Sequence, residues 1–154
     1  MKKTTVFSTL KIMHLAMLAG QVFFTAVIFY LVYSKIMIPM FVEHEKMLQV
    51  IAIAFVSAVI FIGINLFKKK LLVIKDDAQI EANKKILKYR SICLIQWALL
   101  EAGVLFCGIC TLLTGNYAFL ALATVIIIYF TLLTPVKNKI ATQLNLSSTE
   151  LDEL

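Results

Sequence analysis

One carboxyl group stands alone in a long apolar stretch of this chain, and it is the first residue to consider for chemistry. Glu101 is the only charged residue between Arg90 and Lys137. A helix over about 91–113 would place it near the middle of a lipid bilayer. An acidic residue at that depth costs about 2.5–3.5 kcal/mol on insertion scales. We therefore expect Glu101 to face a bundle interior, either as a proton or cation relay or as a neutral hydrogen-bonding group.

The partner that we predict for Glu101 is an amide on the first apolar segment. Gln21 lies ten residues beyond Lys11, and Glu101 lies eleven beyond Arg90, so both would be about 15–17 Å deep. A hydrogen bond between them would contribute about 0.6–2 kcal/mol. Two further candidates lie beside this pair: Trp97 is one turn below Glu101, and Thr25 is one turn above Gln21. Ser57 and Thr124, near mid-span, are weaker candidates. We expect His14, Gln96 and Asn65 to be solvated near the cytoplasmic interface.

A second constellation with chemical potential is a pair of cysteines. Cys107 and Cys110 have the spacing of a redox motif, and Cys93 lies on the same segment. Membrane thiol oxidoreductases need a second cysteine pair to relay electrons, which this chain lacks, and a disulfide between residues three apart strains a regular helix. We interpret the cysteines as small packing residues and keep thiol redox as a minor alternative.

Other kinds of site find no support in the sequence. Glu43, His44 and Glu45 are consecutive, so they cannot share one helix face as metal ligands commonly do. The chain has no phosphate-binding loop and no nucleophile with a neighbouring base. We therefore expect no metal, no cofactor and no enzymatic activity.

The composition places these residues in a membrane. The chain has 154 residues, of which 61% are hydrophobic and 16% charged, and its mean hydropathy is +0.92. Soluble domains have about 45–50% apolar and roughly 25% charged residues, and a chain of this length has too small a core to bury the excess. The composition thus excludes a soluble domain, a disordered chain, a disulfide-stapled secreted domain and a soluble nucleic-acid binder.

Four uncharged stretches are long enough to be transmembrane helices, since about 20 apolar residues span the hydrocarbon core. Thr114-Gly115-Asn116 is typical of a turn between the third and fourth, and Pro135 should end the fourth. We predict a single all-α domain over 1–154, an integral membrane four-helix bundle of two hairpins. The predicted spans are at about 12–34, 47–67, 91–113 and 117–134. The outer loop at 34–46 should lie in the membrane interface, and the inner loop at 68–90 should be a helix that continues into the third span. The tail at 135–154 should contain a short terminal turn.

The basic residues predict the orientation of these spans. Of the fifteen Lys and Arg residues, only Lys35 and Lys46 lie on the side opposite the termini. Cytoplasmic loops of membrane proteins are enriched in basic residues, so both termini and the inner loop should be cytoplasmic. The net charge of +6 is then a topology signal that also suits anionic lipid headgroups, and we expect no nucleic-acid partner.

The first and third spans align with each other at an offset of 82 residues. Ala16 and Gly20 then coincide with Ala98 and Ala102, so each span has two small residues four apart. This spacing lets transmembrane helices approach closely. A parallel internal repeat would explain the match, and chance similarity between two apolar segments is an equal alternative.

Three strings in the second half resemble uncharacterised small bacterial membrane proteins with four transmembrane helices. They are Lys88-Tyr89-Arg90, Ala98-Leu99-Leu100-Glu101 and Leu113-Thr114-Gly115-Asn116. The resemblance implies a bacterial inner membrane and indicates no activity, partner or catalytic residue.

The sequence therefore favours a structural or accessory membrane subunit that packs against itself or another membrane protein. The alternative is a small proton- or cation-coupled transporter or channel that uses Glu101. This alternative would need an oligomer, because four helices enclose little space.

Overall fold

A computed structural model describes residues 6–76 and 81–146 of the chain, and it is all-helical there, with no strand. The predicted terminal turn after Leu146 lies outside the described residues. The elements, in order, are α1 (Val6–Tyr33), the short 3-10 helix η1 (Val42–His44), α2 (Glu45–Asp76), α3 (Ala82–Thr114), α4 (Ala118–Leu132) and α5 (Lys137–Leu144).

In the described part of the chain, three helices are long and apolar enough to cross a membrane, as expected of a multi-pass membrane protein. The qualifying segments are Phe7–Tyr33, Val42–Lys75 and Lys84–Thr114. Each exceeds the 20 or so residues that a bilayer core requires. The predicted inner loop is itself largely helical, because α2 continues to Asp76 and α3 begins at Ala82 and runs without a break into the third span.

The fourth predicted span differs from expectation. Its helix, α4, has only 15 residues, about 22 Å at 1.5 Å per residue. It is long enough to span a membrane only together with α5, and a bend of 75° separates the two helices. Pro135 lies in the break between α4 and α5. Because proline has no backbone N–H, it cannot donate the hydrogen bond that would continue α4. The structure therefore contains three candidate spans and one bent pair.

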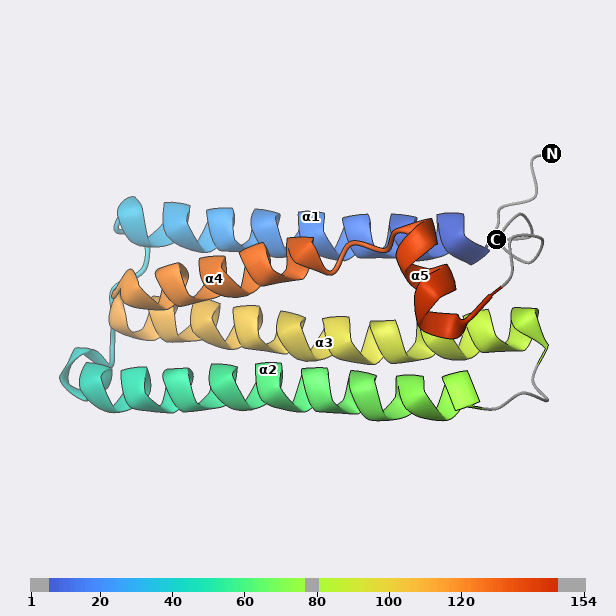
Figure 1. The fold of residues 1–154 in the computed structure, drawn as a ribbon. Helices are drawn as coiled ribbons and strands as arrows, with labels where there is room; N and C mark the ends of the chain where they lie inside the picture. The colour runs from blue at the N-terminus through green and yellow to red at the C-terminus, as the bar shows by residue number, and fades with distance from the viewer. Residues whose placement is uncertain (1–5, 77–80, 147–154) are drawn as a thin grey trace.

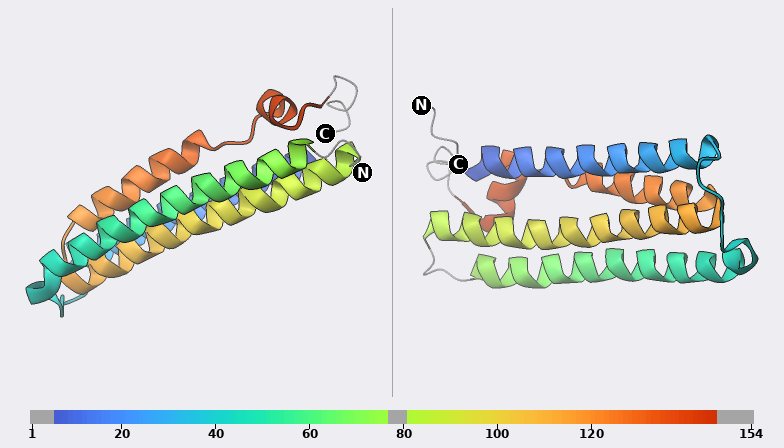
Figure 2. Two further views of the ribbon diagram at one scale, coloured as in Figure 1. Left: turned by 60° about the horizontal axis from the view of Figure 1, so that its bottom comes forward. Right: turned by 180° about the vertical axis from the view of Figure 1, so that it is seen from behind.

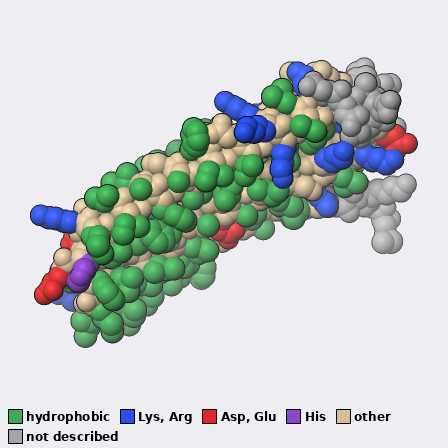
Figure 3. All heavy atoms as spheres, turned by 90° about the horizontal axis from the view of Figure 1, so that it is seen from below, with side chains coloured by type: hydrophobic (Ala, Val, Ile, Leu, Met, Phe, Trp, Pro, Cys, Tyr) green, Lys and Arg blue, Asp and Glu red, His purple; other side chains and the backbone are tan. Residues whose placement is uncertain are grey.

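The helices α1 to α4 lie side by side along one long axis, as Figures 1 and 2 show. Helix α3 contacts α1, α2 and α4, and α5 lies across the end of the molecule and packs against α2. Hydrophobic side chains cover the middle of the face drawn in Figure 3, and the charged side chains on that face lie mainly toward its ends. This distribution is what a protein needs when lipid surrounds its middle.

The turn between α3 and α4 forms where the sequence predicts it. Gly115 has φ +71° and donates its N–H to Thr111 at 2.7 Å, which closes α3 with a left-handed cap. The Asn116 side chain accepts a hydrogen bond from Ala118 N–H at 2.7 Å and so caps the start of α4. Pro39 of the outer loop covers this turn, and a Cβ on Gly115 would lie 2.8 Å from its ring.

The predicted internal repeat stays a prediction. The two helices that align, α1 and α3, pack side by side with His14 against Trp97 and Phe24 against Gly108, pairs that are 83 and 84 residues apart. Their partners differ in length, however, because α2 has 32 residues and α4 has 15.

Candidate functional site

The predicted hydrogen bond between Glu101 and Gln21 is absent. Gln21 is only 2% exposed, and neither its amide nitrogen nor its amide oxygen has a partner among the described residues. Glu101 is half-buried at the edge of the packed helices, with no hydrogen bond or ion pair to a described residue. The sequence places the two residues at similar depths in the membrane. Depth alone does not determine the direction in which each side chain points from its helix. Glu101 thus lies at the margin of the packed interior, and its predicted role stays a prediction.

The faces of the two helices explain the separation. Gln21 belongs to the buried stripe of α1, with Leu10, His14 and Ile28 at helical spacing. Thr25 donates its hydroxyl to the main-chain oxygen of Gln21 at 2.8 Å, a bond within α1. Thr25 therefore connects no helix to another, and it does not reach the Glu101 carboxyl.

The small residues do not make the predicted close approach between α1 and α3. Ala16, Gly20, Ala98 and Ala102 are all exposed, and a Cβ added to Gly20 would meet nothing within 4 Å. The two helices instead meet where the ring of Phe24 lies against Gly108, so closely that a Cβ on this glycine would collide with the ring. Close approach thus uses one glycine of α3, and the four predicted packing residues face outward.

These outward residues share one side of the molecule. Gly20 lies one turn before Phe24 on α1, and Glu101 lies two turns before Gly108 on α3. Residues at these spacings share a helix face, so Gly20 and Glu101 lie along the same seam between the two helices. Ala98 and Ala102 flank Glu101 on the exposed face of α3. We call this surface the small-residue seam; it comprises Ala16, Gly20, Ala98, Glu101 and Ala102.

His14 is buried, although we predicted that it would be solvated. It is 2% exposed, its ring stacks on Phe130 with centroids 4.6 Å apart, and it meets Trp97 edge-on at 4.9 Å. Its Nε2 donates to the Phe130 carbonyl oxygen at 3.0 Å. The Phe130 carbonyl lies near the end of α4 and also accepts the Leu133 N–H at 3.0 Å, so the histidine adds a second hydrogen bond to it.

The three cysteines are buried free thiols inside the packed helices. They contribute small apolar side chains to the hydrophobic core beside Trp97 and Val104. No group of metal-binding side chains occurs among the described residues. Glu45, from the sequence string considered for metal ligation, instead accepts hydrogen bonds from the Gln49 and Asn116 side chains.

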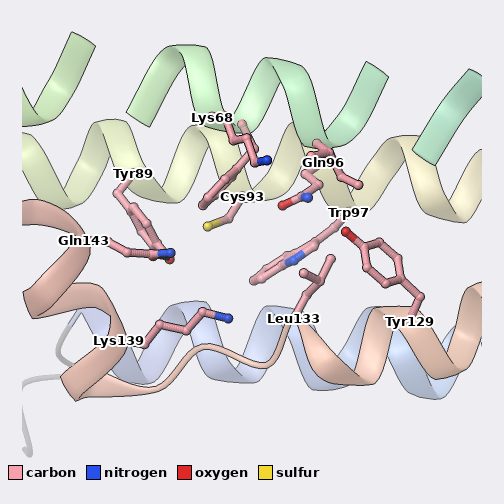
Figure 4. Close-up of a pocket in the computed structure, with 11 residues that line it drawn as sticks. Lys68, Tyr89, Cys93, Gln96, Trp97, Tyr129, Leu133, Lys139 and Gln143 are labelled. Carbon is pink, nitrogen blue, oxygen red and sulfur yellow. Dashed lines mark hydrogen bonds between the residues drawn. The ribbon is translucent and has the colours of Figure 1, made fainter. Parts of the chain in front are cut away.

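A cavity of about 170 Å³ lies between α2, α3, α4 and α5. Figure 4 shows Lys68 from α2 and Lys139 from α5 pointing toward the space around Gln96 and Trp97. Tyr89 donates its hydroxyl to the Gln143 side-chain oxygen at 2.8 Å and so ties α3 to α5 at its edge. The lining consists of Ile64, Phe67, Lys68, Tyr89, Cys93, Gln96, Trp97, Tyr129, Leu133, Lys139 and Gln143.

Sequence reasoning missed this cavity because it missed α5. The sequence predicts only a cytoplasmic tail over 135–154, whereas residues 137–144 form a helix that buries Ile140, Ala141 and Leu144. Those three positions fit one face of a helix, and this pattern was the signal available in the sequence. Trp97 had been singled out for its place near Glu101, but it is 1% exposed and lines the cavity instead.

Comparison with known proteins returned no match to a family model, to a curated protein or to a solved structure. Function must therefore be inferred from the small-residue seam, the cavity and the long apolar helices themselves.

Proposed function

We propose that this protein is a non-enzymatic structural or accessory subunit of the membrane, which packs through its small-residue seam against a second copy or another membrane protein. The observation that carries the proposal is the exposure of Ala16, Gly20, Ala98 and Ala102. Small residues four apart let a partner helix approach closely in lipid, where van der Waals packing replaces the hydrophobic effect as the driving force.

The position of Glu101 supports an assembled state. A half-buried carboxyl beside an exposed apolar surface is costly in the middle of a bilayer, even when it is neutral. A partner helix on the seam would exclude lipid from this group and could donate a hydrogen bond to it. We infer that Glu101 contributes to this helix contact through hydrogen bonding.

The membrane context that we propose follows from the basic residues. The three long helices and the bent α4–α5 pair would form a transmembrane four-helix bundle in a bacterial inner membrane, with both termini in the cytoplasm. The two basic residues of the opposite side, Lys35 and Lys46, flank the loop between α1 and α2. Reporter fusions at residue 40 and at the C-terminus should report opposite sides of the membrane, and a same-side result would contradict this topology.

The subunit role is tested by placing bulky side chains on the small-residue seam without disturbing the fold. Gly20→Leu and Ala102→Leu should each weaken assembly by tenfold or more, because a bulky side chain would separate the partner helices. The matched control is Ala54→Leu, since Ala54 is an exposed alanine of α2. Assembly is measured by photobleaching step counts of the labelled protein in liposomes, and folding by circular dichroism.

The effect of substituting Glu101 distinguishes a structural role from a role in ion transport. Under the proposal, Glu101→Gln keeps a hydrogen-bonding side chain and should leave assembly within about twofold of wild type. If the substitution abolished a cellular function while expression and assembly remained intact, the structural role would be wrong. Unchanged assembly in both leucine variants would also contradict it.

A proton- or cation-coupled channel is the second candidate, and the seam position of Glu101 is what favours it. Copies packed through their seams would gather several carboxyls at a shared interface near mid-membrane. Ion flux that depends on assembly and disappears in Glu101→Gln would support the channel. Liposomes that show no gradient-driven flux of protons, Na⁺ or K⁺ would exclude those ions as its cargo.

A further inference from the structure

We propose that the cavity between α2, α3, α4 and α5 binds the phosphate of an anionic phospholipid headgroup, with the first carbons of the lipid against its apolar wall. The site is separate from the small-residue seam. Basic pockets between transmembrane helices on the cytoplasmic side commonly bind such headgroups. Three properties of the cavity carry the proposal: its charge, its unmatched hydrogen-bond donors and its apolar lining.

The charge of the cavity is positive and uncompensated. Lys68 and Lys139 reach it from α2 and α5, and its eleven lining residues include no carboxylate. Neither lysine forms an ion pair with a described residue. Two ammonium groups that converge on one space suit a phosphate, to which lysine binds as a compact point charge.

Hydrogen-bond donors around the cavity also lack partners. Gln96 is only 6% exposed, its amide lies in the cavity wall, and no described residue hydrogen-bonds with it. The Trp97 indole N–H and the Tyr129 hydroxyl are likewise without a hydrogen-bond partner among the described residues. The polar atoms of these three side chains are not fully enclosed by protein, so they remain able to hydrogen-bond with a ligand in the cavity. A ligand with several acceptor oxygens and no donor of its own would satisfy them together.

The remaining wall is apolar, which favours an amphiphile over a purely polar ion. Ile64, Phe67 and Leu133 line it beside the indole of Trp97. The cavity volume of about 170 Å³ is many times the roughly 10–15 Å³ that holds a single water molecule. That is room for a phosphate and several carbons, so the acyl chains must extend into the bilayer. Inorganic phosphate or a soluble phosphate ester shares the polar chemistry but leaves the apolar wall uncovered.

The only tryptophan of the chain provides a direct probe. Because Trp97 is 1% exposed, bulk acyl chains should not reach its ring. The full chain is reconstituted in vesicles that contain either phosphatidylglycerol or phosphatidylcholine, brominated in the upper part of the acyl chain, and fluorescence quenching is measured. Two lysines that each favour an anionic lipid about fivefold predict a preference for phosphatidylglycerol on the order of 10- to 30-fold.

Two double variants test the assignment. Lys68→Gln with Lys139→Gln should reduce the preference below about twofold. Lys11→Gln with Lys75→Gln is the control, since it removes the same charge from two exposed lysines that do not line the cavity, and the preference should persist. Equal quenching of the wild-type protein by both lipids would overturn the proposal without any variant, and so would a full preference in a folded Lys68/Lys139 variant.

A soluble arm distinguishes the source of the phosphate. Glycerol 3-phosphate and inorganic phosphate are titrated onto the protein in phosphatidylcholine vesicles while Trp97 emission is recorded. The lipid assignment predicts no saturable change and no protection from brominated phosphatidylglycerol. If either compound changed the emission saturably and blocked quenching by the anionic lipid, the ligand would be a soluble phosphate and the lipid assignment would be wrong.

Discussion

The buried histidine of α1 offers a quantitative test of the packing described above. The His14 ring stacks on Phe130 at 4.6 Å and meets Trp97 at 4.9 Å, and its Nε2 donates to the Phe130 carbonyl oxygen at 3.0 Å. Each aromatic pair contributes about 0.5–1.5 kcal/mol, and a hydrogen bond between membrane helices contributes about 0.6 kcal/mol. His14→Ala, which removes all three contacts, should lower the free energy of unfolding by about 2–3 kcal/mol.

A second substitution separates the ring contacts from the hydrogen bond. His14→Phe keeps a ring between Trp97 and Phe130 and loses only the hydrogen bond. The Phe130 carbonyl still accepts the Leu133 N–H at 3.0 Å, so it is not left without a partner. The expected loss is therefore below about 1 kcal/mol.

Unfolding of these variants is measured with SDS in mixed micelles, followed by far-UV circular dichroism, because Trp97 fluorescence would respond to the substitution itself. Leu15→Ala is the control, since Leu15 is 63% exposed and should stay within about 0.5 kcal/mol of wild type. If His14→Ala were as stable as this control, or if His14→Phe were as destabilised as His14→Ala, the proposed packing would be refuted.

Three further predictions concern the same packed helices. Gly108→Val should destabilise the fold by about 1–3 kcal/mol in the same assay, because its side chain would collide with Phe24; a neutral effect would contradict the α1–α3 contact. Tyr89→Phe removes the hydrogen bond to Gln143 and should weaken the packing of α5 by about 0.5–1.5 kcal/mol. The expected result is faster proteolysis after Leu133, and unchanged proteolysis would argue against a stabilising role of this hydrogen bond. Cys107 and Cys110 are buried away from the cavity that Cys93 lines, so a maleimide should label these two thiols only after unfolding, and their rapid labelling in the folded protein would be inconsistent with their burial.

Sequence reasoning was most successful where local chemistry decides the outcome. The Thr114-Gly115-Asn116 turn is confirmed, because a left-handed cap at Gly115 and a side-chain cap from Asn116 depend only on neighbouring residues. The long helices follow from the uncharged stretches for a similar reason. Their apolar length determines the element, whatever its neighbours are.

Sequence reasoning failed where the outcome depends on helix rotation. Counting residues from the predicted membrane surface places Glu101 and Gln21 at the same depth. Burial depends instead on the direction in which each side chain points from its helix, and these two differ in direction. The small residues show the same problem. A pair such as Ala98 and Ala102 suits an internal contact or an external one equally, and their spacing alone does not distinguish the two.

The cavity could not be predicted because its parts are far apart in the chain. Lys68, Gln96 and Lys139 come from α2, α3 and α5. Each of them separately is a common residue at the end of a membrane helix. Only the bend at Pro135, which returns α5 onto α2, brings them together.

The central claim, that the small-residue seam binds another membrane helix, is tested most directly by photo-crosslinking in living cells. A photoreactive amino acid is placed at Ala102 on the seam or at Val125, an exposed residue of α4 outside it. The account predicts that Ala102 forms a crosslink to a second copy or to one other membrane protein, and that Val125 forms none. Lipid adducts alone at both positions would contradict it.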